Sequence, residues 1–328
     1  NRLMNKGWKP KDFTPDGKPK VDESILSTLD YPEAKLLSEH FLIAKRIGML
    51  AEGNNAWLKL QQDGKIYGSV ITNGANTGRC THQRPNVAQT PSVSVPYGKE
   101  CRSLFTVPDG YVLIGCDASG LELRCLAHYL GAFDEGSFAR ELLDGDVHSK
   151  NQKQIGLPSR DMAKRVIYGI IYGIGDTRLG SIVEKTSYEG KRIKAKLFET
   201  IPALKALRDS VLVKTRNQKY LLGLDKRKLI PRSEHSSLNL LIQSCGALII
   251  KMATIILHKK LEEKNYDKNI CSMVAHIHDE LQLQCKSDYA NEVGAIAVQS
   301  IKDAGTYFNL RCPLDAEFKI GKTWADTH

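Results

Sequence analysis

Several features are missing from this 328-residue sequence, and each absence excludes a class of protein. Its eight cysteines include no CxxC pair, and several lie inside apolar runs such as GCDASG and LRCLAH. This excludes a zinc site or a disulfide framework and predicts buried free thiols in a reducing cytoplasm. We find no charged-then-apolar targeting segment, and no run apolar for long enough to span a bilayer, so we expect no membrane partner. Internal repeats and low-complexity blocks are also missing.

Positive charge, in contrast, is in excess. The chain carries 47 Lys and Arg against 37 Asp and Glu, a formal net charge of +10. A basic surface suits a polyanion such as nucleic acid, although many basic proteins bind none. The hydrophobic content of 41% is enough for a sizeable core and for more than one folding unit.

Residue patterns predict strands near the start, middle and end of the chain, with a helical insert between them. The expected strands are GKIYGSVITNGANTGR (a short strand running into a loop), residues 111–116, two short strands around His278-Asp279-Glu280, and CPLDAEFKIGKTW. Helical spacing marks residues 31–60, a helix from 121, and much of 131–264, with starts at Ser159 and before Asn239. The order indicates an α+β sheet domain interrupted by a helical one.

Two aspartates stand where strands end. Asp117 closes the apolar run YVLIGC, and Asp279 lies at the tip of the expected hairpin. A carboxylate at such a position is costly unless it is paired or bound to a metal. If the two strands are neighbours, the pair can hold two divalent ions roughly 3.5–4 Å apart, as in phosphoryl transfer. For Asp117 alone, capping of the following helix is the simpler interpretation.

The segment SRDMAKRVIYGIIYGIG predicts a helix with two different faces. Arg160, Lys164, Tyr168 and Tyr172 recur every four residues and form one stripe. Ala163, Ile167, Ile170 and Ile174 form an apolar stripe beside it. Two cations near a helix N-terminus followed by aromatic rings suit a nucleoside triphosphate, although an ordinary amphipathic helix is the commoner case. Gly169 and Gly173, expected inside the helix, indicate close approach or bending.

Polar residues in less regular sequence form a third group. They are Arg79, Asn86 and Gln89 in TGRCTHQRPNVAQTP, and His235, Asn239 and Gln243 in EHSSLNLLIQSCG. Arg and Gln are suitable donors to acceptors that every base pair presents in the minor groove. Polar residues of surface loops are the alternative.

The segments DASGLELR (117–124), RDMAKRVIYGIIYG (160–173) and HDE (278–280) resemble motifs A, B and C of the family A, or Pol I-type, DNA polymerases. GWKPKDFTPDGKP, KRIGMLAEG, GDVHSKNQ and TWADTH extend the likeness, which is strongest to the replicative polymerases of T-odd-type podovirus bacteriophages. The segment from Val211 to Leu224 is shorter than in those relatives, which is expected from either a natural deletion or missing residues.

The resemblance implies a role for each matching residue. Asp117, Asp279 and the Ala118 carbonyl would be the ligands of two Mg²⁺ ions, for which Mn²⁺ can substitute. Lys164, with the two aspartates, would be catalytic. Contacts to the triphosphate are expected from His148, Arg160 and Lys164. Tyr168 would lie beside the sugar of the incoming nucleotide, with Glu122 as its partner in a steric gate against a 2′-hydroxyl. Tyr172 would lie beside the template base. Contacts to DNA are expected from Arg79, Asn86, Gln89, His235, Asn239, Gln243 and His278.

The resemblance also implies a right-hand polymerase fold with an antiparallel β-sheet palm, helical fingers and a partial thumb. We expect the partial thumb and connection at 1–64, the palm at 65–130 and 239–328, and the fingers at 131–238. The family's proofreading exonuclease would precede Asn1, since no paired acidic exonuclease motif is present. Expected partners are primer-template DNA, deoxynucleoside triphosphates (dNTPs) and a processivity factor on a further portion of the thumb. Expected localisation is cytoplasmic, in a host cell if a phage encodes the chain.

Three other functions compete with a DNA polymerase that extends a primer. A single-subunit RNA polymerase shares the palm-and-fingers plan, but Glu122 with Tyr168 suits exclusion of ribose. A non-catalytic primer-template binding module would have no reason to keep both aspartates and both cations. A two-metal nuclease would account for the carboxylates but not for the basic, tyrosine-bearing helix.

Overall fold

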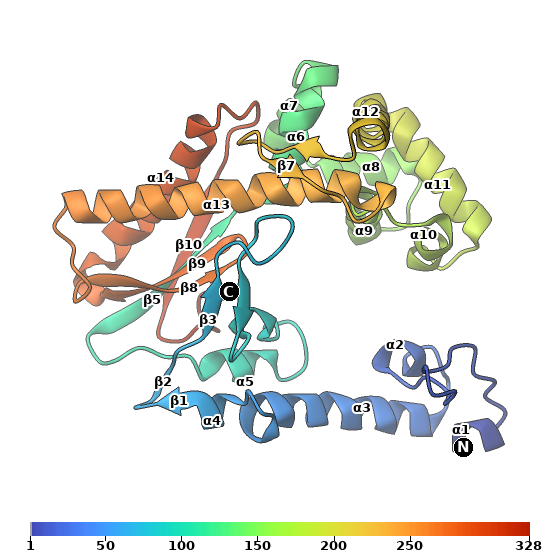
Figure 1. Cartoon of the computed structure of the whole chain (residues 1–328), viewed down its shortest axis with the longest axis horizontal. Coiled ribbons are helices and arrows are strands. Elements are labelled where there is room, and N and C mark those ends of the chain that lie inside the picture. The colour runs from blue at the N-terminus through green and yellow to red at the C-terminus, as the bar shows by residue number, and fades with distance from the viewer. Residues whose placement is uncertain (1) are drawn as a thin grey trace. The chain divides into compact units, whose positions relative to one another are not determined.

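The computed structural model describes residues 2–328, which divide into two compact units (Figure 1). The first unit runs up to Val70 and includes His82–Gln89; the second comprises Ile71–Thr81 and Thr90–His328. Strands β3 (Ser69–Ile71) and β4 (Thr81–Gln83) pair where the chain passes between the units. The division does not separate palm from fingers, so the boundaries expected at 64, 130 and 238 stay predictions.

The first unit is mostly helical, with a small core of Leu3, Leu26 and Ala34. Its elements are α1 (Arg2–Asn5), α2 (Glu23–Leu26), α3 (Pro32–Ile47), α4 (Trp57–Leu60), β1 (Gln61–Gln62) and β2 (Lys65–Ile66). The helix expected across 31–60 is interrupted, because a π-helical turn at Gly48–Glu52 follows α3 and the sequence then runs through Gly-Asn-Asn. These three residues have low helix propensity, so α4 starts anew at Trp57.

An antiparallel four-stranded sheet organises the second unit. Its order is β10-β5-β9-β8, with β5 at Tyr111–Ala118, β8 at Cys271–Ile277, β9 at Glu280–Lys286 and β10 at Ala316–Gly321. The strands predicted from the residue patterns are therefore confirmed in this region. Strand β5 is interior to the sheet, which explains its continuous apolar run, and Ile114 and Cys116 are fully buried. All eight cysteines are free, and all but Cys80 are buried, as predicted.

The longest helix, α13 (Ser237–Glu263), is apolar around most of its surface and packs against α6 (Leu121–Asp134), α12 (Pro202–Gln218) and α14 (Ala290–Tyr307). By length and composition, Glu234–Glu263 could cross a membrane, so the expectation that no run has this property was wrong. However, 67% of its most apolar window is buried inside the structure, as in a core helix. In Figure 1, α13 runs from the sheet region to a group of helices at its other end.

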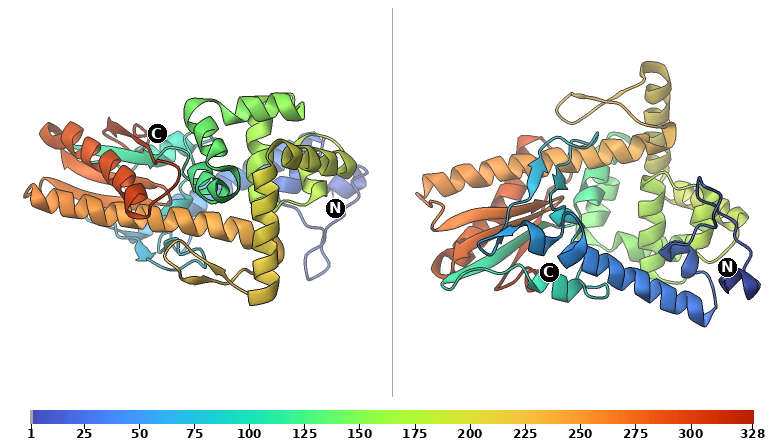
Figure 2. Two further views of the ribbon diagram at one scale, coloured as in Figure 1. Left: turned by 90° about the horizontal axis from the view of Figure 1, so that it is seen from above. Right: turned by 60° about the horizontal axis from the view of Figure 1, so that its bottom comes forward.

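That group is the predicted helical insert, and Figure 2 shows it gathered around one end of α13. It contains α8 (Val147–Ile155), α9 (Arg160–Ile171), α10 (Asp176–Ile182), α11 (Ser187–Thr200) and α12, followed by the short pair β6 (Leu221–Leu222) and β7 (Lys228–Leu229). Helix α7 (Ser137–Asp144) packs on α6, and α5 (Gly98–Ser103) precedes β5. Helix α12 crosses the first half of the segment 211–224 without a break. An α+β fold with a helical insert is therefore confirmed.

Candidate active site

The two aspartates expected to bind metal lie on adjoining parts of the central sheet. Strands β5 and β9 are hydrogen-bonded neighbours, and their register pairs Asp117 with Glu280. The Ala118 N–H donates to the Asp279 carbonyl at 3.1 Å. Asp279 itself occupies the two-residue turn between β8 and β9, after His278, which has a positive φ of 57°. The fold thus brings together carboxylates that are 162 positions apart in the chain.

Negative charge accumulates at this edge. The pKa of Asp117 is raised to about 7, first by desolvation and then by the charges of Asp279 and Glu280. Desolvation also raises the pKa of Asp279, although its own backbone N–H and Arg79 oppose the shift. The Asp117 side chain remains accessible to solvent, so an ion can reach it even though neighbouring protein atoms displace much of its water. Two carboxylates that repel each other, and that solvent can reach from one side, favour a bound cation.

The donor set fits Mg²⁺. No cluster of three or more His, Cys, Asp or Glu suited to a metal occurs within residues 2–328. The candidate site therefore rests on the two carboxylates of Asp117 and Asp279, which the pairing of β5 with β9 brings together. Mg²⁺ is a hard cation that is commonly held by one or two carboxylates together with water and substrate phosphates. A site completed by the phosphates of a nucleotide is therefore consistent with these residues.

Helix α9 presents the predicted basic and aromatic stripe. Its N-cap is Ser159, whose side chain accepts a hydrogen bond from the Met162 N–H. Arg160 and Lys164 are exposed, whereas Ala163, Ile167 and Ile170 are buried, as the two predicted faces require.

The helix is shorter than the sequence pattern indicated. It ends at Ile171, so Gly173 and Ile174 lie beyond it and not inside it. Gly173 has a φ of +73°, and a Cβ there would stand 2.1 Å from the His235 carbonyl oxygen. Both the backbone conformation and the close approach require glycine at this position.

His148 joins this cluster from α8. Its side chain is buried, and its ring centroid lies 6.3 Å from that of Tyr168. Burial lowers the His148 pKa, and the charges of Arg160 and Lys164 lower it further, while Asp146 acts in the opposite sense. The imidazole is therefore predominantly neutral at pH 7, and its Nδ1 has no hydrogen-bond partner in the described chain.

Glu122, near the start of α6, links the tyrosine stripe to Arg79. The Tyr172 hydroxyl donates to Glu122 Oε2 at 2.5 Å, and Arg79 Nη2 lies 3.1 Å from Glu122 Oε1. The resemblance suggested Tyr168 as the partner of Glu122, but in this structure the hydrogen bond comes from Tyr172. The Tyr168 ring lies beside the Tyr172 ring, and their centroids are 6.2 Å apart. Burial, followed by the charges of Glu122 and Asp279, raises the pKa of Tyr168 to about 12.

The residues expected to contact DNA fall in both units. Asn86 and Gln89 belong to the first unit, where both are exposed. In the second unit, Asn239 and Gln243 share one face of α13, since they are four residues apart. The others in this unit are Arg79, His235 and His278, the last two exposed.

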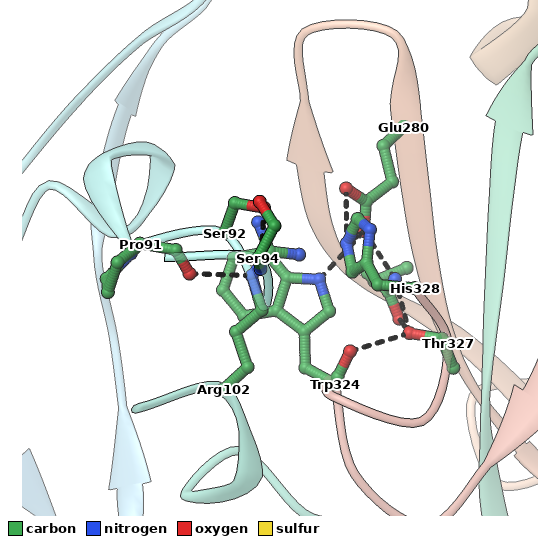
Figure 3. Close-up of polar contacts among 9 residues, drawn as sticks. Pro91, Ser92, Ser94, Arg102, Glu280, Trp324, Thr327 and His328 are labelled. Atoms are coloured by element: carbon green, nitrogen blue, oxygen red, sulfur yellow. Dashed lines mark hydrogen bonds and ion pairs between the residues drawn. The ribbon is translucent and has the colours of Figure 1, made fainter. Parts of the chain in front are cut away.

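A buried network surrounds Glu280, and no pattern in the sequence indicated it (Figure 3). Trp324 Nε1 donates to Glu280 Oε1 at 2.8 Å, and His328 Nε2 lies 2.9 Å from Oε2. Although burial alone would raise the pKa of Glu280, hydrogen bonds from His328, Gln282 and Trp324 lower it overall. The Arg102 guanidinium covers the Trp324 ring at 4.4 Å and donates to the Pro91 carbonyl. The segment TWADTH is the one available clue, and it does not reveal that its side chains reach β9.

Comparison with known structures identifies the fold. The chain superposes on the POL domain of Pol1 from M. smegmatis, in a complex with DNA primer-template and dNTP, with a TM-score of 0.82. The match covers 97% of this chain and 58% of that one at 21% sequence identity. The right-hand polymerase fold expected from the resemblance is thereby confirmed.

The family follows from sequence. Residues 2–326 match the profile of DNA polymerase family A, and the chain belongs to that family. It is 43% identical to the DNA-directed DNA polymerase of Enterobacteria phage T3 and 42% identical to that of Escherichia phage T7. Each alignment covers 100% of this chain but 51% of the relative, so the chain spans about half the length of these relatives.

Proposed function

We propose that this chain is the polymerase portion of a template-directed DNA polymerase, which adds deoxynucleotides to a primer 3′ end. The observation that carries the proposal is the pairing of β5 with β9, which sets Asp117 beside the Asp279 turn. The cations and aromatic rings of α9 supply the complementary chemistry for a nucleoside triphosphate. The proposed subdomains are a partial thumb at 1–64, a palm at 65–130 and 239–328, and fingers at 131–238.

Asp117, Asp279 and the Ala118 carbonyl would hold two Mg²⁺ ions, with Mn²⁺ as a substitute. When bound, the ions would lower the pKa of the primer 3′-hydroxyl and neutralise charge on the leaving phosphates. The charge pattern of the two aspartates supports this assignment, since their carboxylates repel each other and remain accessible.

Binding and orientation of the triphosphate would come from α8 and α9. Arg160 and Lys164 would hold its phosphates, and Lys164 would also stabilise charge that develops during transfer. His148 would donate a hydrogen bond from its neutral ring. No side chain needs to form a covalent intermediate, so the protein contributes position and charge.

Sugar and base recognition would fall to the tyrosines and Glu122. Tyr168 and Glu122 would exclude a 2′-hydroxyl, and Tyr172 would contact the template base. In the present structure Glu122 is bonded by Tyr172, which gives these three side chains one connected surface. Arg79, Asn86, Gln89, His235, Asn239, Gln243 and His278 would contact primer-template DNA.

The setting of the reaction is inferred from the phage relatives. We propose that the chain takes part in phage genome replication in the cytoplasm of the host cell. A processivity factor bound to a further portion of the thumb remains part of this proposal.

The test is extension of a labelled primer on a template with four dNTPs and Mg²⁺, comparing the chain with Asp279→Asn. Extension that requires the template and is lost in the variant is expected. A chain that binds primer-template without extending it would indicate a binding module, and preferred use of ribonucleotides would indicate an RNA polymerase.

A further inference from the structure

Asp146 is the residue directly before α8, and its two carboxylate oxygens perform different tasks. Oδ1 accepts the backbone N–H groups of His148 at 3.0 Å and Ser149 at 3.2 Å, and so caps the helix. Oδ2 accepts the Ser149 hydroxyl at 2.7 Å and Arg160 Nε at 2.7 Å. One side chain therefore fixes both the start of α8 and the first residue of α9.

The contact with Arg160 uses only one of the five N–H donors of the guanidinium. Within residues 2–328, the structure gives its terminal nitrogens Nη1 and Nη2 no hydrogen bond or ion pair. The Arg160 side chain is 52% exposed, so without a tether it would sample many rotamers. With Nε held, the two terminal nitrogens present a fixed edge that matches two phosphate oxygens.

The residues around Arg160 indicate which ligand its two terminal nitrogens would meet. Asp146 bonds Arg160 and caps the helix that carries His148, and Lys164 lies about one turn beyond Arg160 on α9. We call these four side chains the phosphate cluster. Asp146 is its single acidic member. The Asp146 carboxylate is itself strongly stabilised in its charged form, because bonds from Arg160 and Ser149 lower its pKa.

We propose that Asp146 is a positioning residue for the incoming nucleotide, orienting the Arg160 guanidinium toward the triphosphate while it caps the helix that carries His148. This inference depends on the proposed function. Asp146 touches no substrate and acts through Arg160. In the opposite role, the Asp146 carboxylate would compete with phosphate for Arg160, and its removal would strengthen nucleotide binding.

The two oxygens allow the roles of Asp146 to be separated. Asp146→Asn can keep the capping oxygen Oδ1, but replaces Oδ2 by an NH₂ group that cannot accept from Arg160 Nε. Ser149→Ala is the matched control, because it removes the other hydrogen bond to Oδ2 and leaves the Arg160 contact intact. Thermal unfolding of both variants, and their affinity for primer-template, would show that the fold is unchanged.

The measurement is single-turnover extension as a function of dNTP concentration, which separates nucleotide affinity from the maximum rate. Ordering one long side chain is worth roughly a 2- to 10-fold change in affinity, so we expect the apparent dNTP dissociation constant of Asp146→Asn to rise by about that factor. We expect the maximum rate to change by less than about twofold and Ser149→Ala to behave like the unsubstituted chain.

A double-mutant cycle tests whether the effect passes through Arg160. In an Arg160→Ala background, Asp146→Asn should have no further effect on nucleotide affinity. An effect that persists there would show a role in folding of α8 and would overturn the inference. Unchanged or tighter nucleotide binding by Asp146→Asn would also overturn it while leaving the proposed function intact. If the unsubstituted chain fails to extend a primer, both proposals fall.

Discussion

The aspartate edge of the sheet and the phosphate cluster of α8 and α9 carry opposite charge, and they are built differently. Asp117 and Asp279 are positioned by the backbone, since strand register and a two-residue turn determine where they lie. Arg160 and Lys164 extend from one helix on long side chains, and Arg160 depends on a contact with Asp146. A shift in the register of β5 and β9 would displace every residue pair between these strands, whereas loss of the Asp146 contact would affect the Arg160 side chain alone.

Under the proposed function, this difference is consistent with a division of labour. A short carboxylate on a hydrogen-bonded strand has little freedom, which suits groups that must hold ions at a defined separation. Long cationic side chains adjust to a ligand, which suits the flexible triphosphate. We therefore expect substitutions at the sheet edge to reduce the maximum rate, and substitutions in the phosphate cluster to reduce nucleotide affinity.

The largest effect should come from Asp117→Asn. The amide keeps the size of the side chain but removes the charge that would bind metal. Loss of one electrostatic group of this kind typically lowers the rate by about 100- to 1,000-fold. Single-turnover extension at saturating dNTP would measure this, with Glu317→Gln, a carboxylate opposite Asp117 on β10, as the control. A change confined to nucleotide affinity would contradict the assigned division.

Lys164→Ala should have the next largest effect, mainly on nucleotide affinity and to a smaller degree on the maximum rate, because Lys164 would also stabilise charge that develops during transfer. Hydrogen bonds between charged groups are worth about 1.5–3 kcal/mol, so removal of one should weaken dNTP binding by roughly 10- to 100-fold. Arg165→Ala is a suitable control, because Arg165 is an exposed neighbour on the same helix outside the predicted stripe. Equal effects of the two changes would show only a diffuse attraction for nucleotide.

The stability of the second unit, which contains both compared regions, can be tested through pH. Burial, followed by the charge of Arg311, lowers the pKa of His128 on α6 from 6.5 to about 4. The unfolded chain therefore binds this proton more readily, so stability falls as pH falls from about 6.5 toward 4 and is unaffected at higher pH.

The expected loss between pH 7.5 and pH 5 is about 2 kcal/mol, by linkage between proton binding and folding. Urea unfolding at both pH values would measure it. His128 Nδ1 accepts a hydrogen bond from the Arg311 N–H at 3.2 Å, and in His128→Asn the amide oxygen can take over this role without titrating. The variant should lose less stability at pH 5; an equal loss would mean that other groups dominate.

The sequence predicted the sheet strands and α9 well because their signals are local. Apolar runs, alternation and a Ser159 cap followed by a two-faced pattern are each contained within a few residues. Asp117 and Asp279 are far apart in the chain, so the sequence could place them together only if their strands were neighbours. The register of β5 and β9 shows that they are. Family resemblance suggested the proposed roles of the residues, which periodicity cannot supply.

What the sequence could not reveal are contacts between side chains on different elements. Asp146 resembles any helix cap in sequence, and its ion pair with Arg160 depends on how α8 packs against α9. The helix end at Ile171 was missed for the same reason, since the approach of the His235 carbonyl to Gly173 is set by a segment some sixty residues later.

The smallest expected effect distinguishes Tyr168 of α9 from Tyr172, the residue directly after this helix. Tyr168 carries a hydroxyl whose pKa is raised to about 12, so it is protonated and able to donate at neutral pH. By family analogy, we expect that hydroxyl to favour ready use of dideoxynucleotides. Tyr168→Phe should therefore reduce incorporation of dideoxynucleotides relative to dNTPs by roughly 2- to 10-fold, the value of one net hydrogen bond.

Tyr172→Phe is the matched control for this prediction. It removes the hydroxyl that donates to Glu122, four residues further along the same stripe, and should leave the ratio of dideoxynucleotide to dNTP incorporation unchanged. A competition assay that scores chain termination on one primer-template measures both variants. If Tyr172→Phe shifts the ratio and Tyr168→Phe does not, sugar recognition passes through the Tyr172–Glu122 contact, and the roles assigned to the two rings must be exchanged.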